Sequence, residues 1–391
     1  MRWFLVSDKA LGERVRELRG WLFTQRQLAE RAGVSVDLVR KLEQGTRNSA
    51  SVASLHRLAR ALDVSLAELV GPGSLPEQGS GEGVTALRFA VSGIDDLLDP
   101  SEIEPVEPRE VERTLTYLWG VYWAGRYDQL VSLIPSALAS LRAETGNPAA
   151  VAHGYWVAGC VLTQLRQPDA AFIAIRHAVD AADQSGDPLL AATLRGSLSW
   201  QLMVAGRFVE SEALAVRAAE VIEPRGEVSP PGLSVYGSLV LTAATAAARA
   251  RKNGRARNLL AESSQVAHRI GEDRQDYQTA FGPSQVAMQS VDVGVQTEEF
   301  GDALTAARVM PNAGAALPLA SRARHLTDRA LAHARLGQHD KAANLVLAAE
   351  QMAPDWAKHQ TLVKSVTRDL LGTRESRTPR LRSMAGRIGV R

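Results

Sequence analysis

The chain has 391 residues and a formal net charge of +2, with 45% hydrophobic and 23% charged residues. Such a chain is too long for one compact core and suits two or three domains of a soluble globular protein. Cys160 is the only cysteine, which excludes an intramolecular disulfide framework and fits a reducing, cytoplasmic location.

No secretory leader or membrane anchor is expected. Residues 1–6 hold one arginine and only a very short apolar run. The longest uncharged stretch, residues 228–248, is long enough to span a bilayer. Because it contains Pro230, Pro231 and several small polar residues, we interpret it as a loop that leads into a buried helix.

Charge is distributed unevenly along the chain. Residues 1–71 carry 12 Lys and Arg against 8 Asp and Glu, residues 72–112 carry 2 against 10, and residues 373–391 carry 6 against 1. A basic head followed by an acidic segment indicates a domain that binds a polyanion, with a different function behind it. The alternative is that the acidic segment is only a solvated linker.

Residues 7–71 have the apolar spacing and the capping residues of five helices. Apolar side chains at helical spacing define the first and fourth helices: Leu11, Val15 and Leu18, and then Val52, Leu55, Leu58 and Leu62. Ser65 is expected to cap a short fifth helix, which the Gly-Pro pair at Gly71 ends.

A three-residue turn joins the second and third predicted helices. Thr24 caps the second helix, residues 25–31, and Ser35 caps the third, which ends at Gly45. Gly33 lies at the centre of the turn, where a left-handed backbone is easiest for glycine. Two short helices joined in this way form a helix-turn-helix unit.

Two segments carry a close resemblance to the lambda-repressor-like (Xre/Cro) family: TQRQLAERAGVSVDLVRKLEQG and SLHRLARALDVSLAELVG. The resemblance covers nearly all of residues 11–71, although the link at residues 20–23 looks shorter than usual. It implies a head whose third helix lies in the major groove of double-stranded DNA.

The resemblance also implies which side chains meet DNA. Base contacts are expected from the outward positions of the third helix: Val36, Asp37, Arg40 and Lys41. A lysine can donate to guanine, a carboxylate can accept from cytosine, and valine can touch a thymine methyl group. Phosphate contacts are expected from Gln25, Ser35, Gln44, Thr46, Arg47 and Asn48. The alternative for Arg40 and Lys41 is a solvated helix face.

Arg19 and Glu43 resemble the family's ion pair between the first and third helices. An unpaired carboxylate this close to DNA would repel it, so the pairing has a physical purpose. The alternative for Glu43 is a free surface carboxylate.

Residues 72–110 form an acidic, Gly/Pro-rich connector. The run GPGSLPEQGSGEG at residues 71–83 predicts a flexible tether. Apolar residues return at 84–98, where we expect partly ordered structure packed on the helices that follow.

Residues 111–373 consist of Ala-rich amphipathic helices with a recurring turn. Similar segments recur roughly every forty residues: AGRYDQL (124–130), LRQPDAA (165–171), AGRFVESEA (205–213), NGRARNLL (253–260), EEFGDAL (298–304) and LGQHDKAA (336–343). The pattern resembles degenerate tetratricopeptide repeats and predicts an all-α chain that ends in an α-solenoid of roughly six helix pairs. The alternative is an Ala-rich helical bundle.

A helix-turn-helix head with such repeats resembles regulators of actinobacterial type and the peptide-sensing repressors of Gram-positive bacteria. This resemblance implies a repeat body that dimerises and, in some members, binds a peptide or small molecule in its concave surface. Repeat register places one set of side chains in that groove: Trp119, Tyr122, Trp123, Trp156, Gln164, Trp200, Arg251, Gln289, Gln296 and Arg335. The alternative is that the tryptophans pack between repeats.

The basic tail, residues 374–391, is expected to cap the last repeat or, alternatively, to add DNA contacts. The sequence has no P-loop, nucleophile elbow or His-Glu-x-x-His motif. A lone cysteine cannot build a structural zinc site, and Cys160 in an apolar helix is expected to be an inert thiol. We therefore expect no enzyme, no cofactor and no metal.

These features predict a homodimeric, sequence-specific transcriptional regulator of double-stranded DNA, whose repeat body dimerises or senses a peptide or small-molecule effector. The alternative is a protein-interaction adaptor, antitoxin-like or anti-activator, that the head only targets to DNA. A third reading is that the head has lost DNA binding and serves as an interaction module.

Overall fold

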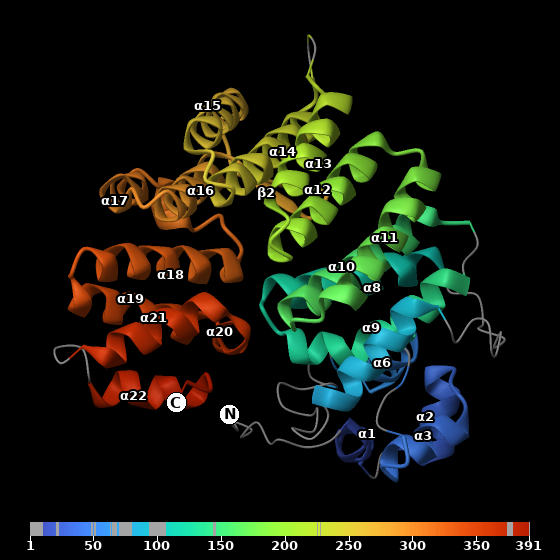
Figure 1. Ribbon diagram of the computed structural model, residues 1–391. Coiled ribbons are helices and arrows are strands. Elements are labelled where there is room, and N and C mark those ends of the chain that lie inside the picture. The colour runs from blue at the N-terminus through green and yellow to red at the C-terminus, as the bar shows by residue number, and fades with distance from the viewer. Residues whose placement is uncertain are drawn as a thin grey trace. The chain divides into compact units, whose positions relative to one another are not determined.

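The structure is a computed structural model that describes residues 11–20, 23–47, 50, 52–62, 64, 69, 80–93, 107–143, 146–224, 226, 228–373 and 378–390. Most of these residues are helical, which confirms the predicted all-α class (Figure 1). Internal contacts divide the chain into two compact units. Unit 1 runs to Leu118 and includes Asp128–Ala158; unit 2 holds Trp119–Tyr127 and Gly159–Arg391.

The head lies in unit 1, and four of its helices are described: α1 (Leu11–Arg19), α2 (Gln25–Ala32), α3 (Val36–Glu43) and α4 (Val52–Ala61). Its core consists of apolar side chains that the helical spacing places inward: Val15, Leu28, Val39, Leu42, Leu55 and Leu58. The predicted fifth helix, residues 65–70, lies almost entirely outside the described residues.

The caps of α2 and α3 explain why these two short helices begin where they do. The Gln27 amide donates to the Thr24 hydroxyl at 3.2 Å, and the Thr24 amide donates to the Gln27 side chain at 2.9 Å. This reciprocal pair satisfies two amides that a helix start leaves unpaired. Gly33 has a φ of 63° and ends α2, and Ser35 then accepts from the Leu38 amide at 3.2 Å.

Part of the acidic connector is helical and packs on the first repeat, as expected for that region. Helix α6 (Ser80–Ser92) buries Leu87 completely. Arg142 of α9 (Tyr127–Ala143) donates to the Ala90 carbonyl oxygen at 2.7 Å. The bond satisfies a carbonyl in the last turn of α6, which has no partner within its own helix.

Six antiparallel helix pairs form the body, and each pair is joined by a three-residue turn. The pairs are α8 (Pro108–Trp123) with α9, α10 (Pro148–Gln164) with α11 (Pro168–Ser185), α12 (Pro188–Val204) with α13 (Phe208–Val221), α14 (Pro230–Arg249) with α15 (Asn253–Ile270), α16 (Pro283–Gln296) with α17 (Phe300–Arg308), and α18 (Leu319–Arg335) with α19 (His339–Met352).

The same backbone motif closes all six turns. The middle residue of each turn is left-handed, with φ between 60° and 78°: Gly125, Arg166, Gly206, Arg251, Glu298 and Gly337. In each turn the next amide donates to the carbonyl five residues earlier, over 2.8–3.2 Å. This is the hydrogen bond that ends a helix in a Schellman motif. The shared motif confirms the six predicted helix pairs.

The fourth turn lies earlier than predicted. Asn253-Gly254-Arg255 resembles the Gly-Arg of other turns, but Asn253 already begins α15, and the left-handed residue is Arg251. A turn needs one residue at positive φ, and here a non-glycine residue fills that position. The predicted register of this repeat was therefore wrong by about three residues.

A small β-hairpin lies between α15 and α16, and the sequence analysis did not predict it. Strand β1 (Arg274–Asp276) pairs antiparallel with β2 (Thr279–Phe281). The two turn residues, Tyr277 and Gln278, have φ values of 48° and 53°. Both central residues of a type I′ hairpin turn have this sign of φ.

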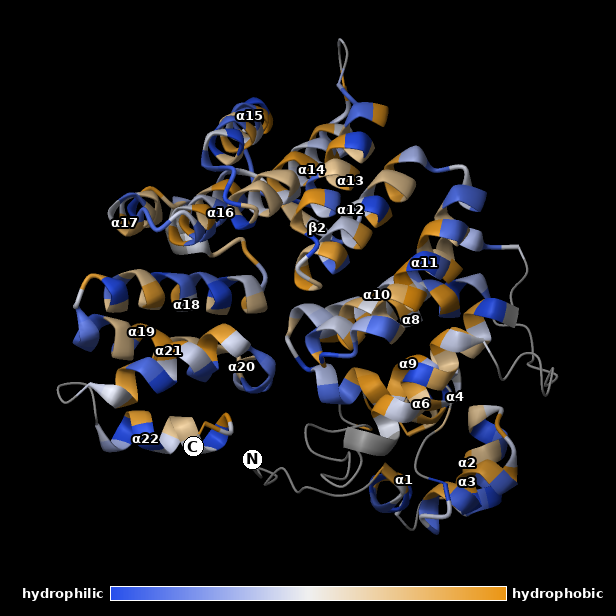
Figure 2. Cartoon of the chain, in the orientation of Figure 1, coloured by the Kyte–Doolittle hydropathy of each residue, from blue (hydrophilic) through white to orange (hydrophobic). Residues whose placement is uncertain are grey.

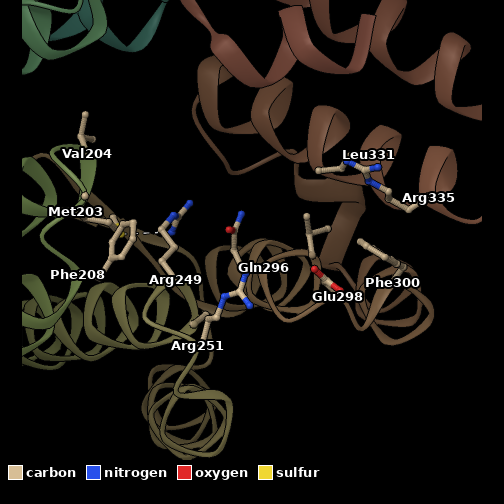
Figure 3. A pocket seen from close by; sticks show the side chains of 13 residues that line it. Met203, Val204, Phe208, Arg249, Arg251, Gln296, Glu298, Phe300, Leu331 and Arg335 are labelled. Atoms are coloured by element: carbon tan, nitrogen blue, oxygen red, sulfur yellow. Dashed lines mark hydrogen bonds between the residues drawn. The ribbon is translucent and has the colours of Figure 1, made fainter. Parts of the chain in front are cut away.

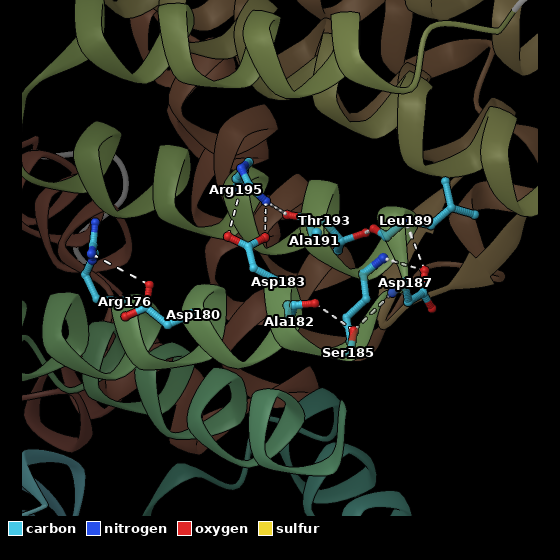
Figure 4. A network of polar contacts seen from close by, with 11 residues as sticks. Arg176, Asp180, Ala182, Asp183, Ser185, Asp187, Leu189, Ala191, Thr193 and Arg195 are labelled. Carbon is cyan, nitrogen blue, oxygen red and sulfur yellow. Dashed lines mark hydrogen bonds and ion pairs between the residues drawn. The ribbon is translucent and has the colours of Figure 1, made fainter. Parts of the chain in front are cut away.

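The hairpin tip reaches two distant helices of unit 2. The Tyr277 hydroxyl donates to Asp187 at 2.9 Å, and Trp123 donates to the Gln278 side chain at 3.1 Å. Asp187 also caps α12 by accepting from the amides of Leu189 and Leu190 (Figure 4). The hairpin thus links α16 to α8 and α12 through side-chain hydrogen bonds.

The helix of the basic tail packs on the last repeat. After α20 (Pro354–His359) and α21 (Thr361–Gly372), α22 (Pro379–Arg387) buries Leu381 and Met384 and contacts α19 and α21. Arg387 forms a two-bond ion pair with Glu350 at 2.7 and 2.9 Å. A terminal helix with one polar face closes the exposed end of a repeat array.

Helix α14 is the one helix among the described residues that is long and apolar enough to cross a bilayer. Few of its residues are strongly hydrophilic (Figure 2). Most of it is buried by α12, α13, α15 and α16, as in the central helix of a helical core. The predicted loop over residues 228–248 is short, since α14 begins at Pro230.

Candidate nucleic-acid interface and ligand cavity

Helix α3 has one buried face and one polar face. Leu38, Val39 and Leu42 are buried against the head. The opposite face carries Val36, which is 43% exposed, together with the four polar side chains Asp37, Arg40, Lys41 and Gln44. The four residues predicted to contact bases, Val36 among them, therefore lie together on one accessible surface.

Asp37 holds the two cations of this surface. Its carboxylate forms an ion pair with Lys41 at 2.7 Å and a second one with Arg40. The hydrogen bond from Lys41 is the main reason why the pKa of Asp37 lies below its ordinary value. The three side chains are about half exposed, so DNA phosphates can compete for both cations.

Glu43 lies at the other end of α3 and is turned away from solvent. Arg19 donates to both of its oxygens at 2.7 and 3.0 Å, and Gln25 donates to one of them at 2.8 Å. Burial alone would raise the pKa of Glu43, but these hydrogen bonds lower it overall. The Arg19 and Glu43 side chains are thus in contact, as the family resemblance implies.

The residues proposed for phosphates divide into three groups. Gln44, Thr46 and Arg47 are exposed after α3, where the backbone turns at Gly45. Ser35 caps α3 with its hydroxyl oxygen, and Gln25 uses its amide group on Glu43, a contact that the sequence analysis did not foresee. Asn48 lies outside the described residues.

The aromatic part of the predicted effector groove is mostly core. Trp119 and Tyr122 of unit 2 are only 3% and 7% exposed, and both rings contact Trp123. In unit 1, Trp156 is 3% exposed and lies 5.5 Å from the His153 ring. The placement of Trp119, Tyr122 and Trp156 on an open groove was therefore wrong, because large aromatic rings fill the space between neighbouring helices.

Other predicted groove residues are engaged by unit 2 itself. Trp123 is bonded to the hairpin residue Gln278, and Gln164 accepts from Gln360 at 2.9 Å. Trp200 and Gln289 are partly exposed, on α12 and α16.

Three predicted groove residues line one cavity of about 870 Å³ in unit 2: Arg251, Gln296 and Arg335 (Figure 3). The cavity also holds side chains that the sequence analysis missed, above all Arg249, Phe208 and Phe300. The two phenylalanines share a signal in the sequence, since each is the first helical residue after a repeat turn. A volume of this size is typical of small-molecule sites.

The head matches a known domain family. Residues 10–70 match the model described as a helix-turn-helix domain. The head is a helix-turn-helix domain. Such domains are typical of DNA-binding regulators, and in this chain a body of helical repeats follows the domain. No curated protein matches the chain.

Solved structures align with most of the chain at low sequence identity. A Rap protein, solved with competence and sporulation factor, aligns with a TM-score of 0.50 and 12% identity over 90% of this chain and 99% of its own. PlcR of Bacillus thuringiensis, solved with the peptide PapR7 and DNA, aligns with a TM-score of 0.39 and 12% identity, over 86% and 99% of the two chains. The Rap alignment supports a common helical fold behind the helix-turn-helix domain.

Within the ranges that the structure describes, no group of three His, Cys, Asp or Glu side chains is placed to hold a metal ion. Cys160 is buried beside Tyr122 and Tyr127, and burial raises the pKa of both tyrosines. The helix-turn-helix domain and the cavity are two candidate sites among the described residues.

Proposed function

We propose that the chain is a cytoplasmic, sequence-specific transcriptional regulator that binds double-stranded DNA as a homodimer and has no enzymatic activity. The observation that carries this proposal is the exposed face of α3, on which Val36, Arg40 and Lys41 lie side by side beyond the capped start of the helix. In helix-turn-helix proteins this face of the second helix of the motif meets base edges in the major groove.

A homodimer would recognise a longer stretch of DNA sequence than a single head can. One α3 spans only a few base pairs, whereas two heads related by a two-fold axis read two half-sites about 34–36 Å apart. The six helix pairs offer the surface for such an association. Sedimentation of the full chain, alone and with a duplex that carries two half-sites, measures the stoichiometry.

An effector that binds the repeat body would regulate the head by favouring one arrangement of the dimer over another. The cavity at Arg251 and Arg335 supports this part of the proposal, since it is open to solvent and large enough for a small ligand. The Rap protein, which has a similar fold, was solved with competence and sporulation factor.

The test is selection of duplexes from a random pool by the full chain, followed by fluorescence anisotropy on the selected sequence. Lys41→Ala should weaken the selected duplex by about tenfold and reduce its advantage over a scrambled duplex, because a base contact carries discrimination. Arg217→Ala on α13, an exposed arginine far along the chain from α3, is the matched control.

Equal affinity of the wild-type chain for selected and scrambled duplexes would refute sequence-specific recognition. If no duplex binds in dilute buffer, the third reading, in which the head has lost DNA binding and serves as an interaction module, becomes the better account of the head. Both outcomes leave the fold of the head unchanged, which circular dichroism of the same preparations checks.

A further inference from the structure

The cavity of unit 2 lies where four consecutive repeats turn. Its walls come from the last residues of α12, α14, α16 and α18 and from the first residues of α13 and α17. Each turn places the carboxyl end of one helix beside the amino end of the next, so the helix dipoles largely offset one another there. The charge of the cavity is therefore set by its side chains.

One arginine of the cavity is already neutralised. Arg249 lies 3.3 Å from the buried carboxylate of Asp292, which also binds Arg324 at 2.9 Å. The Asp328 carboxylate pairs with Arg324 in turn. The charges of two arginines and two aspartates thus balance, and Arg249 is held in place by this network.

The charges at the rim of the cavity do not cancel in this way. Arg251 and Arg335 are exposed, and their guanidinium groups form no hydrogen bond or ion pair with the residues that the structure describes. Glu298 is the only acidic side chain in the lining. Two unengaged guanidinium groups against one carboxylate leave an excess of one positive charge for a ligand.

The rest of the lining is apolar. Met203, Val204, Phe208, Phe300 and Leu331 surround the charged rim, and Val204 is 53% exposed. Figure 3 shows Arg251 beside Gln296 and Arg335 next to Leu331, with Phe208 and Phe300 on either side of Gln296. A ligand with an apolar body would remove this surface from water, and its anionic group would reach a guanidinium fork.

We infer that this cavity binds a monoanionic organic carboxylate with an apolar body, held by Arg251 and Arg335 and packed on Val204, Phe208 and Phe300. The inference rests on the proposed function only in naming the class of effector. A single negative charge matches the excess charge of the rim, and a planar carboxylate accepts two parallel hydrogen bonds from arginine. The carboxylate can belong to a free acid or to the end of a short peptide.

The experiment is calorimetric titration of the full chain with matched probes. The free acid is 4-phenylbutyrate, with 4-phenylbutyramide as its neutral counterpart and inorganic phosphate as a bare anion. The peptide arm compares acetyl-Leu-Phe as the acid with the same dipeptide as its amide. We expect both acids to bind at least about tenfold more tightly than their amides, and phosphate more weakly than either acid. The tighter of the two acids identifies the source of the carboxylate.

Two variants locate the binding. The double variant Arg251→Gln with Arg335→Gln should weaken acid binding by about tenfold or more, since charge-assisted bonds are lost. Val204→Glu should weaken it through charge repulsion and loss of apolar contact. Arg217→Gln removes an exposed arginine outside the cavity and should leave the affinity unchanged. The three substituted arginines are exposed, and Val204 is about half exposed, so all three variants are expected to fold.

Three results would overturn the inference: equal binding of acid and amide, unchanged binding by the double variant, or no binding of any probe to the wild-type chain. Duplex binding, measured on the same preparations, separates this inference from the proposed function. If the wild-type chain recognises the duplex but does not bind the acids, only the proposed ligand class is refuted. If it binds the acids but no duplex, only the proposed regulator function is refuted.

Discussion

Arg19 binds Glu43 through two hydrogen bonds of 2.7 and 3.0 Å and so fastens α1 to the end of α3. The Glu43 side chain is only 2% exposed. Arg19→Ala would leave this carboxylate buried with Gln25 as its remaining side-chain donor. We expect a loss of about 2 kcal/mol in the stability of the head.

Hydrogen exchange of the α3 amides measures that loss, as a drop of roughly thirtyfold in protection. The control is Arg26→Ala, because Arg26 pairs with Glu30 on the surface of α2, where both side chains are more than 60% exposed. Such a pair contributes at most about 0.5 kcal/mol. Similar protection in the two variants would contradict the structural role of the Arg19–Glu43 pair.

Asp37→Asn should strengthen non-specific DNA binding. The substitution removes a negative charge from the exposed face of α3 and releases Arg40 and Lys41 for phosphates. We expect the slope of log affinity against log salt to become steeper by about one unit. Anisotropy with a scrambled duplex at several salt concentrations gives the slope.

Glu210→Gln is the matched control for that charge. Glu210 is also an exposed carboxylate paired with an arginine three positions away, Arg207, but it lies on α13 in unit 2. An equal change in slope for both variants would mean that overall charge, and not the position of Asp37 on α3, governs the effect.

Gly237→Ala should destabilise the repeat body, although alanine normally favours a helix over glycine. A Cβ atom at Gly237 would lie 2.1–2.6 Å from the ring of Phe281, which is fully buried in the hairpin. We expect a loss of about 2 kcal/mol from this overpacking, measured by urea unfolding. The double variant with Phe281→Leu should recover part of it.

The control for that substitution is Gly120→Ala on α8. A Cβ atom at Gly120 meets no other atom within 4 Å, so the helix preference alone should act. We expect a gain of about 0.5–1 kcal/mol. If both variants shift stability in the same direction, Phe281 does not pack on Gly237 as the structure has it.

His325 should make the repeat body sensitive to mild acid. Burial, aided by the nearby charge of Arg329, lowers the pKa of His325 to about 4. Below the ordinary histidine pKa of about 6.5, the unfolded chain takes up a proton that the folded chain refuses, so stability falls as the pH falls. Between pH 7 and pH 5 this contributes a loss of about 2 kcal/mol.

The measurement is urea unfolding of the wild type and of His325→Gln at both pH values. The difference between the two proteins isolates the contribution of this one group from that of the carboxylates. The wild type should lose the extra stability, whereas parallel losses in both proteins would show that His325 has the same pKa in the folded and unfolded states.

The sequence predicts those features that are set by neighbours along the chain. Thr24, Gly33 and Ser35 define the head because caps and turns are local hydrogen bonds. The six helix pairs can be predicted from the sequence because each pair needs a three-residue turn with one left-handed residue. The contact of Arg19 with Glu43 joins residues far apart in the chain, and only the family resemblance suggested it.

The predictions that were wrong or missing concern features that depend on contacts between repeats. Trp119 and Trp156 have the spacing of groove residues, yet the position of the neighbouring helices decides whether a tryptophan is covered. The hairpin carries Tyr277 and Gln278 at its turn where Asn-Gly would be the recognisable signal. Arg251 was placed on the groove, but no glycine or other local signal marks it as the turn residue itself.

The hairpin tip has a consequence for how the body unfolds. In an ideal solenoid each repeat touches only its neighbours, so the array behaves as a one-dimensional chain that can fray from either end. Here the hairpin residue Gln278 is hydrogen-bonded to Trp123 of the first helix pair, and Tyr277 is hydrogen-bonded to Asp187 at the start of the third pair. Gln360, after the last pair, is hydrogen-bonded to Gln164 of the second pair. Such cross-links couple distant parts of unit 2, and unit 2 should therefore melt cooperatively instead of repeat by repeat.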